Sequence, residues 1–152
     1  MTVGRYYKGS RGASGTAEVW AWDDGRPPQP LRLRTDVANH SPTGFEWGYS
    51  GSGPAQLALA IILDYLASDP VRGDAMGVIL GIIAAPGLSE ARRARWRRKA
   101  NTEIALRLHQ RFKQRVIAAL APDKAWVMTA FQVGVTLAEI ADSERREETH
   151  PT

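Results

Sequence analysis

The hydrophobic positions of this chain predict a buried helix near its middle. Between residues 55 and 66, apolar side chains cover almost the whole circumference of a helix, and a helix that is apolar all round belongs in the centre of a core. Pro54 suits the first helical turn, where a backbone N–H is not needed, and Ser68-Asp69-Pro70 is a stop signal. We therefore predict a central helix over residues 54–67.

A longer amphipathic helix is predicted over residues 90–120, with Ser89 as its N-cap. Its apolar positions recur every four residues, which gives one buried stripe. The stripe consists of Ile104, Leu108, Phe112, Val116 and Leu120. Thr129 and Gln132 have the spacing of a capping box, which predicts a short C-terminal helix. The apolar side of that helix would hold Phe131, Val135, Ala138 and Ile140.

Short alternating segments predict a small antiparallel sheet. Three of them lie before residue 35, at 3–8, 16–22 and 31–34, and Asp23-Asp24-Gly25 supplies a tight turn between the last two. A fourth strand is expected at 125–128. The pattern predicts the α+β class: a β-meander packed against the central helix, the long basic helix and the short C-terminal helix.

Length and composition favour one domain. The chain has 152 residues, of which 43% are hydrophobic and 24% charged, close to the averages of globular proteins. We expect one domain over residues 1–142 and a disordered polar tail over residues 143–152, where no aliphatic side chain occurs. The apolar runs are too short to cross a bilayer and no secretory signal is present, so we expect a cytoplasmic protein without membrane contact.

Residues 71–85 form an apolar stretch with glycines at four-residue spacing. On a helix, Gly73, Gly77 and Gly81 would form a smooth groove for a neighbouring helix. The stretch is also apolar enough to predict a surface for self-association or for a host protein.

Positive charge is concentrated in the predicted long helix. Residues 88–115 contain ten basic and two acidic side chains, in a chain whose net charge is +4. The cluster comprises Arg92, Arg93, Arg95, Trp96, Arg97, Arg98 and Lys99. Its six cations surround the helix, so this part cannot be buried on one face. Arginine binds phosphate bidentately and tryptophan offers a stacking surface, so the expected partner is nucleic acid or an acidic protein. The alternative is a solvated helix end without a partner.

A glycine-rich loop before the central helix is a second candidate site. It contains His40, Glu46, Gly48, Gly51 and Gly53. A helix N-terminus attracts anions, but the spacing G-x-x-G-x-G matches neither a P-loop nor a dinucleotide fingerprint. One interpretation is a ligand-binding loop, and the other, which we favour, is a loop whose glycines allow close packing.

No catalytic or metal site is indicated by the sequence. The chain has no cysteine, and its three histidines lack a metal-ligand spacing, so we expect no metal and no cofactor. We expect His109 to be solvated, and Asp64 to face solvent or to pair with a basic residue such as Arg115.

Several segments together carry a family resemblance. They are HSPTGFEWGY at 40–49, GSGPAQLALA at 51–60, Tyr7-Lys8-Gly9, residues 112–120 and residues 125–129. These segments resemble an uncharacterised family of small proteins from bacteria, archaea, phages and plasmids. The resemblance implies a small α+β domain with an accessory role on mobile elements, and it implies no known catalytic residue. Residues 70–100 depart from the family pattern and are interpreted as a helical insertion.

These observations predict a non-enzymatic accessory binding protein of phage or mobile-element type. The leading hypothesis is that its arginine-rich helix contacts nucleic acid or a nucleic-acid-handling host complex, as an anti-defence inhibitor would. The alternative is a homo-oligomeric or host-protein interaction module that uses residues 71–85.

Overall fold

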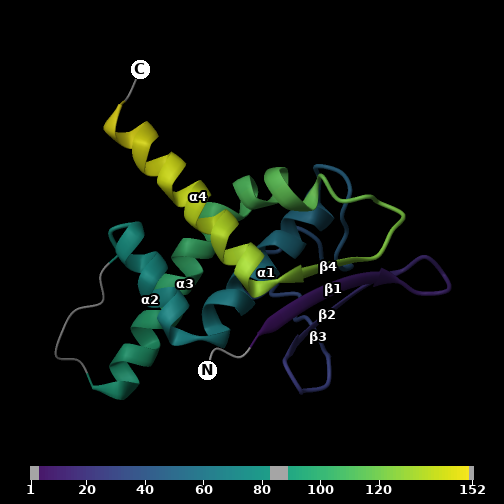
Figure 1. The fold of residues 1–152 in the computed structure, drawn as a ribbon, viewed down its shortest axis with the longest axis horizontal. Coiled ribbons are helices and arrows are strands. Elements are labelled where there is room, and N and C mark those ends of the chain that lie inside the picture. Colours follow the sequence, from purple (N-terminus) through teal and green to yellow (C-terminus); the bar gives the residue numbers. More distant parts are fainter. Residues whose placement is uncertain (1–3, 83–88, 151–152) are drawn as a thin grey trace.

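A computed structural model describes residues 4–82 and 89–150, and these residues form a sheet packed against helices (Figure 1). The sheet is antiparallel, has four strands in the order β3-β2-β1-β4, and lies beside four α-helices. The α+β class predicted from the sequence is confirmed.

The sheet is centred on β1 (Arg5–Arg11), which pairs with β2 (Ala17–Asp23) on one side and β4 (Trp126–Thr129) on the other. β3 (Gln29–Pro30) is a two-residue edge beside β2. The strands expected at 3–8 and 31–34 are therefore each displaced by a few residues. After β3 the chain leaves the sheet, because the Leu33 carbonyl accepts a hydrogen bond from the side chain of Gln56 instead of a strand amide.

α1 (Ser52–Ser68) is the predicted central helix, and its residues from Leu57 to Ile62 are completely buried. It begins two residues before Pro54, which still lies in the first turn. Gln56 is the buried polar residue of this helix. Its side-chain oxygen accepts from the amides of His40 and Ser41 at 2.8 and 3.2 Å, and this holds the long connection 31–51 against α1.

A polar network joins α1 to the sheet at Asp64. Arg5 donates two hydrogen bonds to the Asp64 carboxylate at 2.7 and 2.9 Å, and the Tyr7 hydroxyl donates a third at 2.7 Å. Burial is the main cause that raises the pKa of Tyr7, and the adjacent Asp64 carboxylate adds to it. The expected pairing of Asp64 with a basic residue is confirmed, but its partner is Arg5 rather than Arg115, because β1 places Arg5 directly beside it.

α2 (Pro70–Ile79) follows α1 after one residue and packs against α1, α3 and α4. Asp69 caps it by accepting a hydrogen bond from the amide of Val71 at 3.0 Å. The helix ends before Gly81, which has φ +75°. Residues 83–85 of the predicted apolar stretch lie outside the described residues.

α3 (Glu90–Phe112) begins at the predicted cap Ser89 and continues into a π-helical turn, η1 (Lys113–Ile117). Ile104, Leu108 and Phe112 of the predicted stripe are completely buried. After Phe112 the next buried apolar side chain is Ile117, whereas Val116 is only partly buried. The π turn contains one residue more than an α turn, so it shifts the buried face from residue 116 to residue 117.

α4 (Ala130–Thr149) is 20 residues long, so the prediction of a short helix followed by a disordered tail is wrong. The predicted capping box of Thr129 and Gln132 is present. Beyond residue 142 the helix is fixed to α3 by ion pairs rather than by apolar contacts. Arg107 pairs with Glu144 and Glu148 at 2.9 and 2.6 Å, and Arg111 pairs with Glu147 at 2.6 Å.

Candidate functional site

The first half of α3 is a basic surface that the fold leaves exposed. The side chains of Arg92, Arg93, Arg95, Arg98 and Lys99 are all exposed, and within residues 4–82 and 89–150 none of them forms an ion pair. We call these five residues the arginine cluster. Ser89 accepts a hydrogen bond from the amide of Arg92, and Glu90 in the first turn favours the helix dipole, so the cluster sits on an ordered helix.

Trp96 lies within the arginine cluster and is 41% exposed. The Lys99 ammonium is 6.0 Å from its ring centre, at the outer limit of a cation–π contact. Tryptophan is enriched at protein interfaces, where its ring can be buried against a partner.

Arg97 has a different role from its neighbours. It donates to both carboxylate oxygens of Asp74 at 3.2 Å, which links α3 to α2. The same carboxylate raises the pKa of Arg97. Arg97 therefore holds α3 against α2, and the Asp74 carboxylate neutralises its charge. Of the seven residues predicted for this site, Arg97 is the one that the fold uses internally.

The glycines of α2 do not form an open surface. A Cβ atom on Gly73 would lie 2.5 Å from the side-chain oxygen of Asn101 in α3, and one on Gly77 would lie 2.7 Å from the carbonyl of Ile82. Gly81 is outside the helix. The predicted groove against a neighbouring helix is therefore confirmed only at Gly73, which packs on α3. It is wrong for Gly77, which faces the Ile82 carbonyl, and for Gly81, which is not helical.

The glycine-rich loop is packed rather than open. Arg11 of β1 donates to the carboxylate of Glu46 at 2.9 Å and to the carbonyl of Pro122 at 2.7 Å, and its guanidinium lies 4.5 Å from the ring centre of Trp47. Gly48 has φ +88° and lies against Pro122. Gly53 approaches the side chain of Glu46 so closely that a Cβ atom would lie 2.7 Å from it. These contacts favour the packing interpretation of the loop over the ligand-binding one.

His40 and His109, far apart in the sequence, meet in the fold. Their Nε2 atoms are 3.0 Å apart, and the Nδ1 atom of His109 lies 2.9 and 3.1 Å from the carbonyls of Leu106 and Ala105. Nδ1 must therefore carry the proton, so Nε2 of His109 accepts a hydrogen bond from Nε2 of His40. The expectation that His109 is solvated is wrong, because it is 5% exposed.

Burial lowers the pKa of His109, and the nearby His40 and Lys113 lower it further. The neutral form of the His109 ring is consequently favoured, which suits a hydrogen bond that links the connection 31–51 to α3. Within the described parts of the chain, no group of three histidine or carboxylate side chains is arranged to hold a metal ion. The pair has a structural role as a polar contact.

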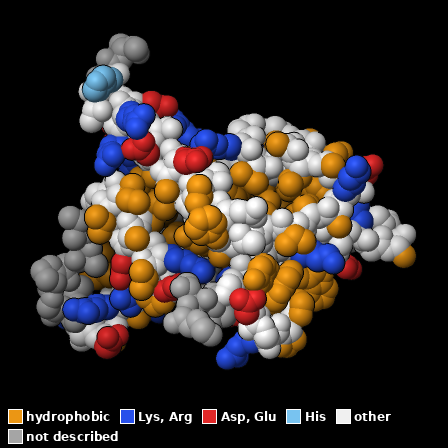
Figure 2. Space-filling model, viewed as in Figure 1, with side chains coloured by type: hydrophobic (Ala, Val, Ile, Leu, Met, Phe, Trp, Pro, Cys, Tyr) orange, Lys and Arg blue, Asp and Glu red, His pale blue; other side chains and the backbone are white. Residues whose placement is uncertain are grey.

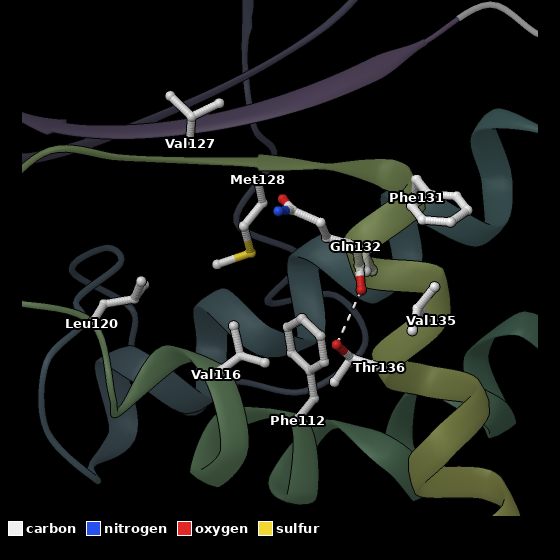
Figure 3. A pocket seen from close by; sticks show the side chains of 10 residues that line it. Phe112, Val116, Leu120, Val127, Met128, Phe131, Gln132, Val135 and Thr136 are labelled. Carbon is white, nitrogen blue, oxygen red and sulfur yellow. Dashed lines mark hydrogen bonds between the residues drawn. The ribbon is translucent and has the colours of Figure 1, made fainter.

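An apolar hollow of about 440 Å³ lies between β4, α4 and the end of α3, and no pattern in the sequence predicts it (Figure 3). Phe112, Val116 and Met128 point into the hollow, and Phe131 at the start of α4 also lines it. Phe131 is 80% exposed, so its predicted place on the buried side of α4 is wrong. The buried side consists of Ala130, Val133, Leu137, Ile140 and Ala141. Figure 2 shows hydrophobic side chains gathered over this region.

The fold and its basic helix define a small α+β domain with an exposed cationic surface. A family model described as a family of unknown function (DUF6166) matches residues 7–75. This match supports the resemblance from β1 to the first half of α2, and it ends before the arginine cluster. No curated protein and no solved structure matches the chain. In the parts that the structure describes, no helix has both the length and the hydropathy to cross a membrane.

Proposed function

We propose that this protein is a non-catalytic binding protein that contacts a nucleic-acid backbone through the arginine cluster. The observation that carries the proposal is the set of five exposed cations on about two turns of α3 that have no acidic partner in the described part of the chain. Phosphates are the ligands that the planar guanidinium fork fits best, and several of them in a row match a polyanion.

The second half of the same helix supports this proposal by contrast. Arg107 and Arg111 are held by glutamates of α4, and Arg115 of η1 is held by Glu139 at 2.9 Å. The chain therefore neutralises arginines where they support the fold. The cations of the arginine cluster, at the start of α3, repel one another because no carboxylate of the described residues neutralises them. An anionic partner would remove this repulsion.

The experiment is fluorescence anisotropy with a labelled 20-base-pair DNA and a labelled RNA, measured over a range of salt concentrations. The test variant combines Arg93→Gln and Arg98→Gln, and the matched control combines Arg107→Gln and Arg111→Gln, which removes the same charge. We expect the test variant to bind more weakly and to lower the slope of log affinity against log salt by about two. We expect the control to retain the slope.

Two results would contradict the proposal. Equal losses in the test and control variants would show that binding follows net charge rather than the arginine cluster. Absence of binding to both nucleic acids at low salt would favour the acidic protein partner instead. The mobile-element and anti-defence roles remain predictions from the resemblance.

Self-association is a second candidate, and exposed apolar side chains of α2 support it rather than the glycines. Val71 and Val78 are 71% and 69% exposed. Pairing of this helix between two copies would bury both. Light scattering after size exclusion tests it: we expect Val71→Asp with Val78→Asp to convert a dimer into a monomer, and a monomeric parent protein would exclude this candidate.

A further inference from the structure

The outer face of the sheet carries an aromatic surface that the helices do not cover. Side chains alternate between the two faces of a strand. Tyr7, Val19 and Ala21 are buried on the helix side, so Tyr6, Trp20 and Trp22 belong to the opposite face. The described helices lie on the other side of the strands (Figure 1). Figure 2 shows hydrophobic side chains gathered over the strands as well.

The aromatic rings on this face are not part of the core. Tyr6, Trp20 and Trp22 are half-buried, and none of them belongs to the core cluster or to the side chains packed on it. Tyr6 and Trp22 are register partners and stack with their ring centres 5.5 Å apart and an interplanar angle of 24°. Trp20 is two residues from Trp22 on the same face. Three large rings on an open sheet face form a flat, apolar surface with polar edges.

A cation lies on the same face, beside these rings. Lys8 is exposed, and its register partners are Trp20 on β2 and Val127 on β4. Arg26, between β2 and β3, and Arg32, just after β3, are also exposed. Within the described residues, none of these three cations forms an ion pair.

Two carboxylates lie near the same face. Glu18 lies at the start of β2, at the end away from Trp22, and is close to Gly12. Asp24 accepts hydrogen bonds from the Gly4 amide and the Tyr6 hydroxyl, and this contact raises the pKa of Tyr6. Lys8 lies on the sheet face itself, whereas the two carboxylates lie at its ends, so an anionic ligand complements this face better than a cationic one.

We propose that this face binds unpaired bases of single-stranded nucleic acid. Bases would stack on Trp20 and on the Tyr6–Trp22 pair, and the phosphate that joins them would lie near Lys8. Every base has a π-face, so an aromatic platform binds single strands with little sequence preference. In a duplex the base faces are stacked on one another and are not accessible to a sheet. The proposed ligand is therefore a single strand rather than a duplex.

This site is separate from the arginine cluster. It lies on β1 and β2, whereas the arginine cluster lies at the start of α3, well away from the strands (Figure 1). The inference shares its ligand class with the proposed function, but it rests on the geometry of the sheet alone. The two sites therefore make different predictions for single strands and duplexes.

The test is fluorescence anisotropy of the full chain with a labelled 12-nucleotide oligothymidine and a labelled 12-base-pair duplex at one salt concentration. The variant combines Trp20→Leu and Trp22→Leu, which keeps the strands apolar but removes the rings, and the control is Val127→Ala on the same face. Circular dichroism checks that each variant is folded. We expect the tryptophan variant to bind the single strand at least about tenfold more weakly and the duplex unchanged, as loss of base stacking requires.

Single-strand affinity equal to that of the parent in a folded Trp20→Leu, Trp22→Leu variant would overturn this inference. A parallel loss of duplex binding would overturn it as well. If Arg93→Gln with Arg98→Gln leaves duplex binding intact while the tryptophan variant loses the single strand, the proposed function fails and this inference stands.

Photo-crosslinking of the unaltered chain covers the case in which the tryptophan variant does not fold. A 12-nucleotide strand containing bromodeoxyuridine is irradiated with the protein, and the crosslinked peptides are identified by mass spectrometry. We expect crosslinks at Tyr6, Trp20 or Trp22. Crosslinks confined to Trp96 would overturn the inference and assign single-strand binding to the arginine cluster.

Discussion

The two halves of α3 have the same secondary structure and opposite relations to the rest of the molecule. From Ile104 to Phe112 the helix buries five side chains, and its arginines pair with α4. From Glu90 to Ala100 it buries none, and Arg97 alone among its cations forms an ion pair in the described residues. The first half adds charge without adding to the core. This difference indicates that its composition serves something other than stability.

The largest expected effect is on the second half of α3, which packs on the core. Leu108→Ala removes a completely buried side chain, and we expect it to lower the free energy of unfolding by about 3 kcal/mol through lost burial and a residual cavity. Leu106→Ala, two residues away and 42% exposed, is the control and should lower it by less than about 1 kcal/mol. Urea unfolding followed by circular dichroism measures both. Equal losses would mean that α3 does not hold the core as described.

A second comparison uses two aspartates that each bind one arginine through both oxygens. Asp64 also accepts from Tyr7, and its side chain is 25% exposed, whereas Asp74 is 51% exposed. We expect Asp64→Asn to lower the free energy of unfolding by about 2 kcal/mol, since hydrogen bonds to buried charges are the stronger ones. For Asp74→Asn we expect less than about 1 kcal/mol. Thermal unfolding of the two variants tests this order, and its reversal would contradict the role of Asp64 in joining α1 to the sheet.

The histidine pair, which lies at the second half of α3, predicts that the free energy of unfolding depends on pH. Burial, with smaller contributions from His40 and Lys113, lowers the pKa of His109 from 6.5, so the unfolded chain binds the proton more readily than the folded chain. The contribution of neutral His109 to the free energy of unfolding is complete above pH 6.5. It is lost as the pH falls through the folded-state pKa of His109. We expect the free energy of unfolding to decrease between pH 7.5 and 5.5.

The variant His109→Gln isolates this effect, because glutamine cannot take up a proton in that range. Its unfolding, measured with urea at the same two pH values, should depend less on pH than that of the parent protein. An unchanged pH dependence in the variant would show that other groups cause the effect.

The smallest expected effect concerns the exposed half. Arg93→Gln with Arg98→Gln removes two charges without ion pairs and should change the free energy of unfolding by less than about 0.5 kcal/mol. Arg107→Gln with Arg111→Gln removes charges that hold the end of α4, and we expect a loss of about 1 kcal/mol. Differential scanning calorimetry compares the two pairs. A larger loss for Arg93 and Arg98 would assign the arginine cluster a structural role.

The sequence predicts correctly those features that depend on residues close together in the chain. The apolar circumference of α1, the buried positions Ile104, Leu108 and Phe112, and the capping box at Thr129 are each set by residues within a few positions of one another. These elements are where the sequence predicts them, with ends displaced by a few residues. The exposed cluster at the start of α3 was predicted in the same way, since six cations in eight residues leave no buried face.

Contacts between distant segments were not predicted, because no local pattern encodes them. Asp64 meets Arg5 only after the sheet packs on α1, and His109 meets His40 only after Gln56 fixes the connection 31–51. The extension of α4 was missed because its last turns contain no apolar residues. Its signal was the spacing of Glu144, Glu147 and Glu148, which places carboxylates on one helix face opposite Arg107 and Arg111.

The π turn at Lys113–Ile117 has a consequence for how the length of this chain can vary. This π turn follows α3 directly and holds one residue more than an α turn. A one-residue deletion within the turn would restore a regular α-helix and would bring position 117 into step with Ile104, Leu108 and Phe112. Relatives that lack one residue here are therefore expected to keep the same fold, whereas a deletion two turns earlier would rotate the buried stripe out of the core.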